Sequence, residues 1–214
     1  MSENKFPSHQ DHLNKTFLEE LSYKIWVTKG SRFYASKRHL TKNDLSNKAN
    51  GFLSAYLIIF GLFSVYQISK DSIINENFIA FGSTAISILL LAFSQMEAAQ
   101  DYKMKAHFFH DCALKLSKIY NEIRIFKTLK NTSEDEREKY AAHMSKRYQA
   151  ILDHYTNHDD IDFKRFKAEQ KAYYQLKKSK VLWIHVNYYW HTKILYHFLI
   201  IAPLLLTVIA LLIR

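Results

Sequence analysis

Residues 52–95 decide the fold of this chain. They read FLSAYLIIFGLFSVYQI (Phe52 to Ile68), SKDSIINEN (Ser69 to Asn77) and FIAFGSTAISILLLAFSQ (Phe78 to Gln95). The first and last of these runs contain no Asp, Glu, Lys, Arg or His, and as helices each would span roughly 25 Å, close to the ~30 Å hydrocarbon core of a bilayer. The pattern predicts a transmembrane helical hairpin. The alternative, a helical pair buried in a soluble core, does not explain the absence of charge over two full lengths.

Composition places the chain in the all-α class. Its 214 residues include 4 glycines and 2 prolines, and Gly61 and Gly82 lie inside the apolar runs. So few turn-forming residues indicate long helices with short joints. Cys112 is the single cysteine, so the sequence provides neither a disulfide framework nor a cysteine-based metal site. The net charge of +10 favours contact with an anionic lipid bilayer, and nucleic acid is not the partner that we expect.

A third apolar run, Ile194 to Ile213, lies near the end of the sequence and is interrupted only by His197 and Pro203. Because it is about as long as the runs of the hairpin, we expect a third transmembrane helix. Aromatic residues cluster just before it or at its start, as in the aromatic belt of a membrane protein: Trp183, Tyr188, Tyr189, Trp190 and Tyr196.

Lysine and arginine are unevenly distributed about the apolar runs. Nine precede Phe52, one lies in the hairpin loop, and nineteen lie between Met96 and Lys193. Because positive charge stays in the cytosol, we predict a multi-pass protein of the inner membrane with a cytosolic N-terminus and an external C-terminus. The expected divisions are cytosolic helices (1–51), the transmembrane hairpin (52–95), a cytosolic helical bundle (96–193) and a third transmembrane helix (194–214).

Two helices are expected before the hairpin. Apolar residues recur at helical spacing from Leu13, and this amphipathic helix should end at Gly30. A basic helix should then begin at Ser31 and run into the first span.

The second span should continue straight into a cytosolic helix with apolar residues in a heptad pattern. These residues alternate steps of three and four: Phe109, Cys112, Leu116, Ile119, Ile123 and Phe126. The seam that they form could close within one chain or between chains. Since the span and its extension would make one rod that can align with copies of itself, we favour a homo-oligomer joined at this seam.

Two more helices are expected in the cytosolic bundle. Ser133 and Glu136 form a capping-box pattern that predicts the start of the first, and its apolar face would consist of Tyr140, Met144, Tyr148, Ile151 and Tyr155. A turn is expected at residues 156–159. The next helix should run on into the third span, with one side made of Phe163, Phe166, Gln170 and Tyr173.

Several residues on either side of the hairpin carry a further pattern: Arg32, Ala35, Arg38 and Leu40 before the span, Ser54 at its inner end, and Asn157, His158, Asp162 and Phe163 in the bundle. With the order of basic helix, hairpin and long cytosolic helices, this pattern resembles the SLATT family of bacterial two-transmembrane effectors. The likeness extends to about Lys171, and the third span departs from the two-span pattern of the family.

The resemblance implies a function. SLATT proteins are found beside nucleotide-second-messenger, reverse-transcriptase and other conflict systems, so this chain would perforate or depolarise the membrane and arrest or kill an infected cell. The sequence contains no recognisable sensor domain. The trigger would therefore come from a partner or a second messenger encoded nearby, and we expect no cofactor.

Small polar residues form a stripe on the second span that could line a conducting path. Ser83, Ser87 and Ser94 fall within about 40° of one another at 100° per residue, and Gln95 and Glu97 would stand at the cytosolic mouth. A carboxylate there would favour cations. Close helix packing is the alternative, because small residues are common where helices meet in lipid.

Histidine patterns offer weaker alternatives. Two groups of possible metal ligands each share a helical face without a residue that completes a site: His107 with His110 and Asp111, and His154 with His158 and Asp162. Arg and His also recur at the spacing of HEPN-type ribonucleases, about as often as composition alone gives, in three pairs: Arg32 with His39, Arg137 with His143, and Arg147 with His154.

We therefore expect a protein without enzymatic activity. A membrane-tethered HEPN-like ribonuclease remains one alternative. Another is a non-enzymatic membrane adaptor that meets RNA or anionic lipid through the basic and aromatic residues of segment 171–183.

Overall fold

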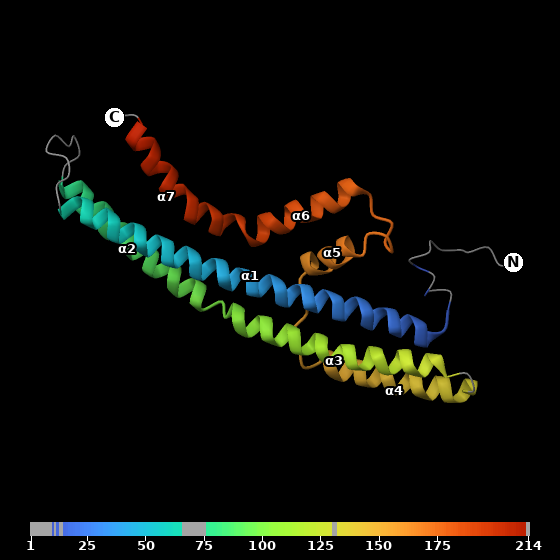
Figure 1. The fold of residues 1–214 in the computed structure, drawn as a ribbon. Helices are drawn as coiled ribbons and strands as arrows, with labels where there is room; N and C mark the ends of the chain where they lie inside the picture. The colour runs from blue at the N-terminus through green and yellow to red at the C-terminus, as the bar shows by residue number, and fades with distance from the viewer. Residues whose placement is uncertain (1–9, 11, 13–14, 66–75, 130–131, 213–214) are drawn as a thin grey trace. The chain divides into compact units, whose positions relative to one another are not determined.

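The computed structural model describes residues 10, 12, 15–65, 76–129 and 132–212, and these residues contain helices and no strand. The prediction of an all-α fold is confirmed. The helices are α1 (Phe17–Val65), α2 (Glu76–Ala98), α3 (Tyr102–Thr128), α4 (Glu134–Leu152), α5 (Asp160–Glu169), α6 (Lys178–Thr192) and α7 (Ile194–Leu212) (Figure 1).

Contacts between the helices divide the chain into two compact units. Unit 1 comprises Met1–Leu40 and Lys103–Tyr189, and unit 2 comprises Thr41–Tyr102 and Trp190–Arg214. The apolar runs of the sequence all belong to unit 2, whereas the heptad helix belongs to unit 1. Helix α1 contributes to both.

Helix α1 continues through Gly30, so the predicted helix end at this residue is wrong. The glycine has a packing role instead. A Cβ at this position would lie 3.0 Å from Cζ of Phe166 on α5 and would collide with two further carbons of that ring. Glycine inside a helix costs about 1 kcal/mol relative to alanine, and here it permits the close approach of an aromatic side chain.

The core of unit 1 lies between the first part of α1, α3 and α4. Figure 1 shows α3 and α4 running side by side. Apolar residues spaced by three and four positions form a continuous face on each helix, and these faces meet. The buried cluster consists of Leu18, Leu21 and Ile25 from α1, Cys112, Leu116, Ile119 and Ile123 from α3, and Ala141, Met144 and Tyr148 from α4.

The heptad seam therefore closes within one chain. Phe109, Cys112, Leu116, Ile119 and Ile123 are buried, and Phe126 packs against the cluster with its ring stacked on Tyr140 at 3.8 Å between centroids. Helices α1 and α4 of the same chain cover this face. The assignment of these six residues to a contact between subunits is corrected accordingly, because a second copy would need another surface.

The expectations for α4 are confirmed. Ser133 is the N-cap, and it forms a capping box with Glu136: the backbone N–H of Ser133 donates to Glu136 Oε2 at 2.8 Å. The predicted apolar face is also present. Met144 and Tyr148 are buried in the cluster, and three neighbours pack against it: Tyr140, Ile151 and Tyr155.

Two helices that the sequence suggested to be continuous are interrupted. The second span does not continue straight into α3, because α2 ends at Ala98 and Asp101 adopts φ = 52°, a left-handed conformation that Asp tolerates better than most residues. Similarly, α5 ends at Glu169 instead of running into the third span. After it, Tyr173 and Tyr174 turn toward Trp26, with ring centroids 5.1 and 6.4 Å away, and this packing replaces the helical path.

In the described part of unit 2, side chains join α1, α2 and α7 through polar contacts with neighbouring helices. Ser94 Oγ donates to Asn50 Oδ1 (3.0 Å), the hydroxyl of Tyr56 donates to the carbonyl of Ile200 (2.9 Å), and the hydroxyl of Tyr196 donates to Glu97 Oε2 (2.8 Å).

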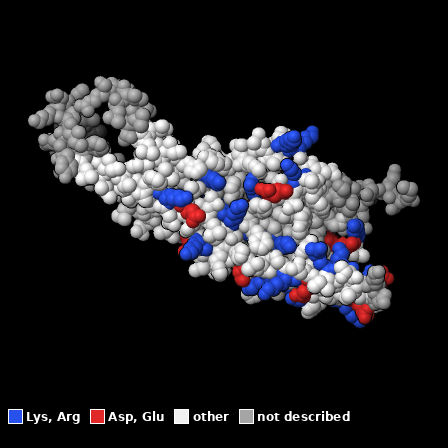
Figure 2. Space-filling view, viewed as in Figure 1, with Lys and Arg blue, Asp and Glu red and all other residues white. Residues whose placement is uncertain are grey.

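Large apolar side chains of unit 2 face outward: Phe81 and Leu89 are 73% and 68% exposed. Among the described residues, one stretch, Ala80–Thr128, which comprises most of α2 and all of α3, contains a segment apolar enough to cross a membrane, and none of this apolar window is buried. Ile194–Leu205 is a shorter apolar helix. The end of the first apolar run and most of the hairpin loop fall outside the described residues. On the face that Figure 2 shows, no charged side chain is seen among the described residues next to the grey loop.

Candidate functional site

Residues of the sequence motif that are more than 120 positions apart meet in unit 1. Helix α1 supplies two arginines, the turn after α4 supplies an asparagine, a histidine and an aspartate, and α5 supplies a second aspartate. We call this group the motif cluster: Arg32, Arg38, Asn157, His158, Asp159 and Asp162.

A buried ion pair forms the centre of the motif cluster. Arg38 Nε donates to Asp162 Oδ1 at 2.8 Å, and Arg38 Nη2 donates to Asp162 Oδ2 at 2.9 Å. The same Nη2 contacts Asp159 Oδ2 at 2.6 Å. Asp162 is 0% exposed, and a two-pronged contact of this kind is among the strongest that a carboxylate makes. Burial alone would lower the pKa of Arg38, but Asp162 and Asp159 outweigh it and raise that pKa.

The carboxylate of Asp162 also caps the first turn of helix α5. The backbone N–H of Asp159 donates to Asp162 Oδ2 at 3.3 Å, and the backbone N–H of Asp162 donates to the carbonyl of Asp159 at 3.0 Å. Acidic residues in the first turn also complement the positive end of the helix dipole. The start of α5 is therefore tied directly to α1 through Arg38.

Arg32 lies six residues earlier on α1, which is about one and two-thirds turns, and it has different partners. It is 2% exposed, yet it donates only to neutral groups, the carbonyl of Thr156 and Asn157 Oδ1 (3.5 Å). Its guanidinium also lies 5.6 Å from the centroid of the Phe109 ring, while its Nε has no hydrogen-bond partner. Burial lowers the pKa of Arg32.

His158 is half-buried in the turn between α4 and α5. Its backbone N–H donates to Asn157 Oδ1 at 3.0 Å, and its buried Nδ1 has no hydrogen-bond partner. Burial and then the charge of Arg32 lower the pKa of His158, against the opposite influence of Asp162. The ring is therefore held neutral next to a buried cation.

The remaining motif residues are not part of this group. Ala35 is buried, whereas Leu40 is exposed. Ser54 is exposed in unit 2, and Phe163 lies under the ammonium group of Lys167.

Sequence reasoning missed several members of the site. Asp159 directly precedes α5, and its position as the helix N-cap was a signal that could have identified it. Phe109 was assigned to the heptad seam, but its ring also stacks on His39 with centroids 5.4 Å apart. Thr156 contributes through its backbone carbonyl, which no residue pattern identifies.

The motif cluster has the chemistry of a structural connection. Its carboxylates are engaged by Arg38, and its second arginine is engaged by a carbonyl and an amide. In the described part of the chain, no group of three His, Cys, Asp or Glu side chains could hold a metal ion. What the arrangement can do is fix the orientation of α1 against α5.

The arginines of the ribonuclease-like pairs each bind another group. Arg137 Nε donates to Thr132 Oγ1 at 3.0 Å, Arg147 Nη2 donates to Glu122 Oε1 at 3.1 Å, and Arg32 belongs to the motif cluster. Elsewhere, Asp111 accepts hydrogen bonds from Tyr155 and from Lys115 at 3.0 Å, and His154 Nδ1 lies 2.7 Å from the carbonyl of Ala150.

The serine stripe lies on α2. Ser83 Oγ donates to the carbonyl of Ala80 at 2.9 Å, and Ser87 Oγ donates to the carbonyl of Ser83 at 2.7 Å. Ser94 contacts α1 and Glu97 contacts α7, as described above, whereas Gln95 is exposed. One end of the stripe, at Ser94 and Glu97, therefore contacts other helices. At the other end, the observed hydrogen bonds of the Ser83 and Ser87 hydroxyls are to carbonyls of α2 itself.

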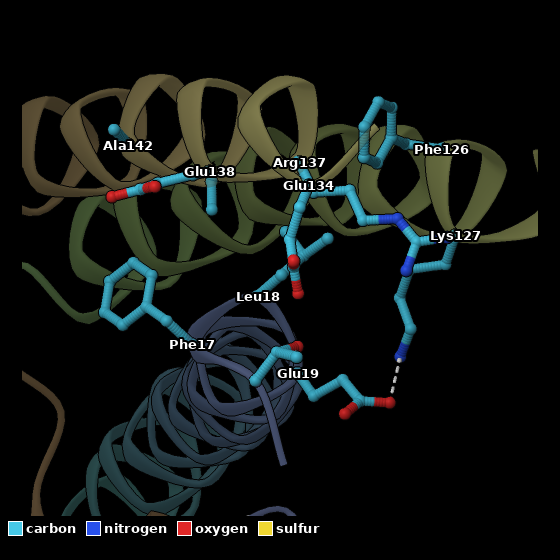
Figure 3. Close-up of a pocket in the computed structure, with 11 residues that line it drawn as sticks. Phe17, Leu18, Glu19, Phe126, Lys127, Glu134, Arg137, Glu138 and Ala142 are labelled. Carbon is cyan, nitrogen blue, oxygen red and sulfur yellow. Dashed lines mark ion pairs between the residues drawn. The ribbon is translucent and has the colours of Figure 1, made fainter. Parts of the chain in front are cut away.

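An open cavity of about 600 Å³ lies at one end of the unit 1 core. Figure 3 shows its lining, with Glu19 of α1 paired to Lys127 of α3 at 3.6 Å. Aromatic rings and charges of both signs surround it: Phe17, Phe126, Glu134, Arg137 and Glu138. Such a lining suits a ligand that combines apolar and charged groups.

Fold and site define a class: all-helical proteins in which an ion-paired helical domain is joined to an apolar helical unit. The chain belongs to the SMODS and SLOG-associating 2TM effector domain family 5, whose model matches residues 14–209. The SLATT resemblance is therefore confirmed, and the chain is a membrane effector of the kind found in conflict and defence systems. No match was found among curated proteins or solved structures.

The extent of the match corrects one expectation. The likeness was predicted to end near Lys171, with the third apolar run as a departure from the family. The family model instead continues to residue 209 and includes most of α7. The last helix therefore belongs to the family domain, in agreement with its contacts to α1 and α2 within unit 2.

Proposed function

We propose that this chain oligomerises in the inner membrane and, when triggered by a partner or a second messenger, forms a pore or otherwise depolarises the membrane. Cell arrest or death follows. Lipid bilayer and further copies of the chain are its direct partners, and its action involves no catalysis.

The observation that carries this proposal is the uncovered apolar surface of α2. The apolar window of this helix has no buried residue, although the chain has other apolar faces that it covers completely. Monomeric soluble proteins rarely leave large apolar patches in contact with water. In a family of two-transmembrane effectors, lipid is the natural cover for this surface.

The charge distribution supports one orientation. Nineteen Lys and Arg residues lie between Met96 and Lys193, against one in the hairpin loop. By the positive-inside rule, the motif cluster lies in the cytosol, where a partner or messenger can reach it. The loop and the C-terminus are external.

The serine stripe supports a conducting path. Ser83 and Ser87 each use their hydroxyl hydrogen on a backbone carbonyl, so the lone pairs of Oγ are directed away from the helix and can accept. A ring of acceptors keeps a narrow path wettable and favours cations. One chain supplies one stripe, so a closed ring requires several copies.

The continuity of α1 offers a route for the trigger. The helix carries Arg32 and Arg38 and continues to Val65 without a break. A partner that displaces the turn after α4 would remove the contacts of Arg32 first, because these involve neutral groups. Rotation of the freed helix would then reorient its apolar half.

The proposal is tested by measuring the membrane potential with a potential-sensitive dye in cells in which the protein is overproduced or triggered. Wild type should depolarise the cells. Ser87→Leu fills the stripe with apolar bulk at no cost to insertion, since Leu is favoured at a span centre, so this variant should insert without depolarising. Ile88→Leu, on a neighbouring face of the same helix, is the matched control and should behave as wild type.

Each alternative result has a clear meaning. Equal depolarisation by the Ser87→Leu protein would remove the stripe from the mechanism. If the triggered wild type leaves the potential intact and degrades cellular RNA instead, the chain is a membrane-tethered ribonuclease. If neither occurs while the protein recruits a partner to the membrane, it is an adaptor.

A further inference from the structure

Helix α6 has an exposed face of unusual composition. One side of the helix is buried in unit 1 through Ile184, which is 3% exposed, and through Tyr188, whose ring lies 5.3 Å from the guanidinium of Arg165. The other side carries large apolar and aromatic residues in contact with solvent: Leu182, Trp183, Val186, Tyr189 and Trp190.

These exposed residues form one face. At 100° per residue they fall within about 120° of the helix circumference, on the side away from Ile184. Trp183 is 58% exposed. Because tryptophan has the largest aromatic side chain, this exposure leaves a large apolar area in contact with water. A surface helix that shows an apolar face on both sides needs a second cover besides its own domain.

The charged residues of the segment that carries this face are all of one sign. Segment 177–193 contains Lys177, Lys178, Lys180 and Lys193 and no Asp or Glu. The ammonium group of Lys180 lies 5.9 Å from the centroid of the Trp183 ring. Tryptophan and tyrosine with flanking lysines are typical of helices at the headgroup level of a membrane, where the rings are partly buried and the lysines meet anionic phosphates.

Continuity along the chain points to the same occupant. Helix α7, which consists largely of apolar residues, begins at Ile194, a single residue after α6 ends at Thr192. If α7 enters the bilayer, the end of α6 must lie at its surface. The exposed face of α6 is then close to lipid headgroups by covalent connection alone.

We propose that α6 is an interfacial helix that lies along the cytosolic surface of the bilayer, with Trp183 and Trp190 inserted among anionic phospholipids. The proposal rests on the membrane location in the proposed function but is independent of pore formation. It gives unit 1 a second attachment to the membrane besides its chain connections to the spans. The lipid class is an anionic glycerophospholipid, because segment 177–193 carries four lysines and no acidic residue.

Tryptophan fluorescence of the full-length protein tests this proposal. The chain has 3 tryptophans, and the third, Trp26, packs edge-on against Phe166 at 4.9 Å inside unit 1. A protein with Trp26→Phe and Trp190→Phe retains Trp183 alone, and one with Trp183→Phe and Trp190→Phe retains Trp26 as the internal control. Both are reconstituted into vesicles of phosphatidylethanolamine and phosphatidylglycerol.

Lipids brominated in the acyl chain should quench Trp183 strongly, whereas aqueous acrylamide should quench it weakly. Trp26 should be insensitive to the brominated lipid. Replacing Lys177, Lys178 and Lys180 together by Gln should lower the lipid quenching of Trp183 to the level found in phosphatidylcholine vesicles. Should the change of Trp26 disturb folding, lipid-quenchable emission that is present in the Trp190→Phe protein and absent in the protein with Trp183→Phe and Trp190→Phe gives the same information.

Efficient acrylamide quenching of Trp183 with no effect of brominated lipid would overturn the proposal, as would protection of Trp183 by added RNA in place of lipid. The measurement needs no trigger and no ion flux. If the protein depolarises cells while Trp183 remains in water, the proposed function stands and this inference fails. If Trp183 lies in lipid and the protein does not depolarise cells, this inference stands and pore formation fails.

Discussion

In unit 1 one apolar face of α3 is covered by α1 and α4 of the same chain, whereas in unit 2 the apolar window of α2 has no buried residue. Leu116 on α3 is 0% exposed and Leu89 on α2 is 68% exposed. Burial of apolar surface contributes about 25 cal/mol per Å², so a leucine left in water forgoes most of what it could contribute. The leucines of the two units therefore point to different surroundings: the protein interior for Leu116 and lipid for Leu89.

The polar contacts between helices are also stronger in unit 1 than in unit 2. Unit 1 carries the motif cluster, with a buried ion pair that fixes α1 against α5. In unit 2, one hydrogen bond joins α2 to α1 and another joins α2 to α7 among the described contacts, and such bonds between helices in a membrane are worth roughly 1 kcal/mol each. The buried ion pair therefore makes the packing of unit 1 costlier to change than either of these hydrogen bonds makes that of unit 2.

The largest effect is expected from a charge in the unit 1 core. Ile123→Asp places a carboxylate where the wild-type side chain is 0% exposed, and an unpaired buried charge costs several kcal/mol. Little folded protein should be recovered, as measured by circular dichroism of the purified material. Ile125→Asp, two residues further on and 65% exposed in the wild type, should fold normally.

This pair of variants also tests the seam. If Ile123→Asp gave a folded monomer that had merely lost crosslinked oligomers, the seam would join subunits, and the contrast between a covered unit 1 and an uncovered unit 2 would disappear.

A smaller loss is expected when the motif cluster is opened. Arg38→Met leaves the buried carboxylate of Asp162 without its partner, and breaking a buried pair costs about 3–5 kcal/mol. Arg147→Met removes the partner of Glu122 in a pair that is 39% and 42% exposed, where about 0–1 kcal/mol is expected. Thermal unfolding of the two variants should differ accordingly. Equal destabilisation would show that Arg38 and Asp162 do not fix the fold of unit 1.

The smallest effect concerns the pH dependence of unit 1. The pKa of His158 lies below its ordinary value of 6.5 because of burial and the charge of Arg32. As the pH falls below 6.5, the unfolded chain takes up a proton before the folded one, so stability is lost. In denaturant titrations, His158→Gln should lose less stability than wild type over this window. If both proteins lose the same stability as the pH falls, protonation of His158 does not cause the pH dependence.

Much of the fold follows from the sequence through periodicity and caps. The capping box of Ser133 and Glu136 and the apolar face of α4 are found as predicted, because both depend on local spacing. The breaks after Ala98 and Glu169 could not be read in this way. They arise from a left-handed Asp101 and from aromatic packing on Trp26, and the second is a tertiary contact with a residue far away in the sequence.

The candidate site was predictable in part. Arg38 and Asp162 were recognised from the family pattern, but pairing across 124 positions leaves no local signal. Gly30 illustrates the opposite error, since a residue that commonly ends helices here serves to admit the ring of Phe166. The seam residues were correctly identified as apolar contacts, whereas the partner that covers them depends on where α1 packs.

The central claim, that the apolar helices of unit 2 lie in lipid and unit 1 lies in water, is tested most directly by cysteine labelling in bilayer nanodiscs. Leu89→Cys and Ile125→Cys replace side chains that are 68% and 65% exposed in units 2 and 1. The natural Cys112 is buried and should not react in the wild type. We predict rapid labelling of the Ile125→Cys protein by a water-soluble maleimide, and labelling of the Leu89→Cys protein only after detergent is added. Equal rates in the intact nanodisc would contradict the claim.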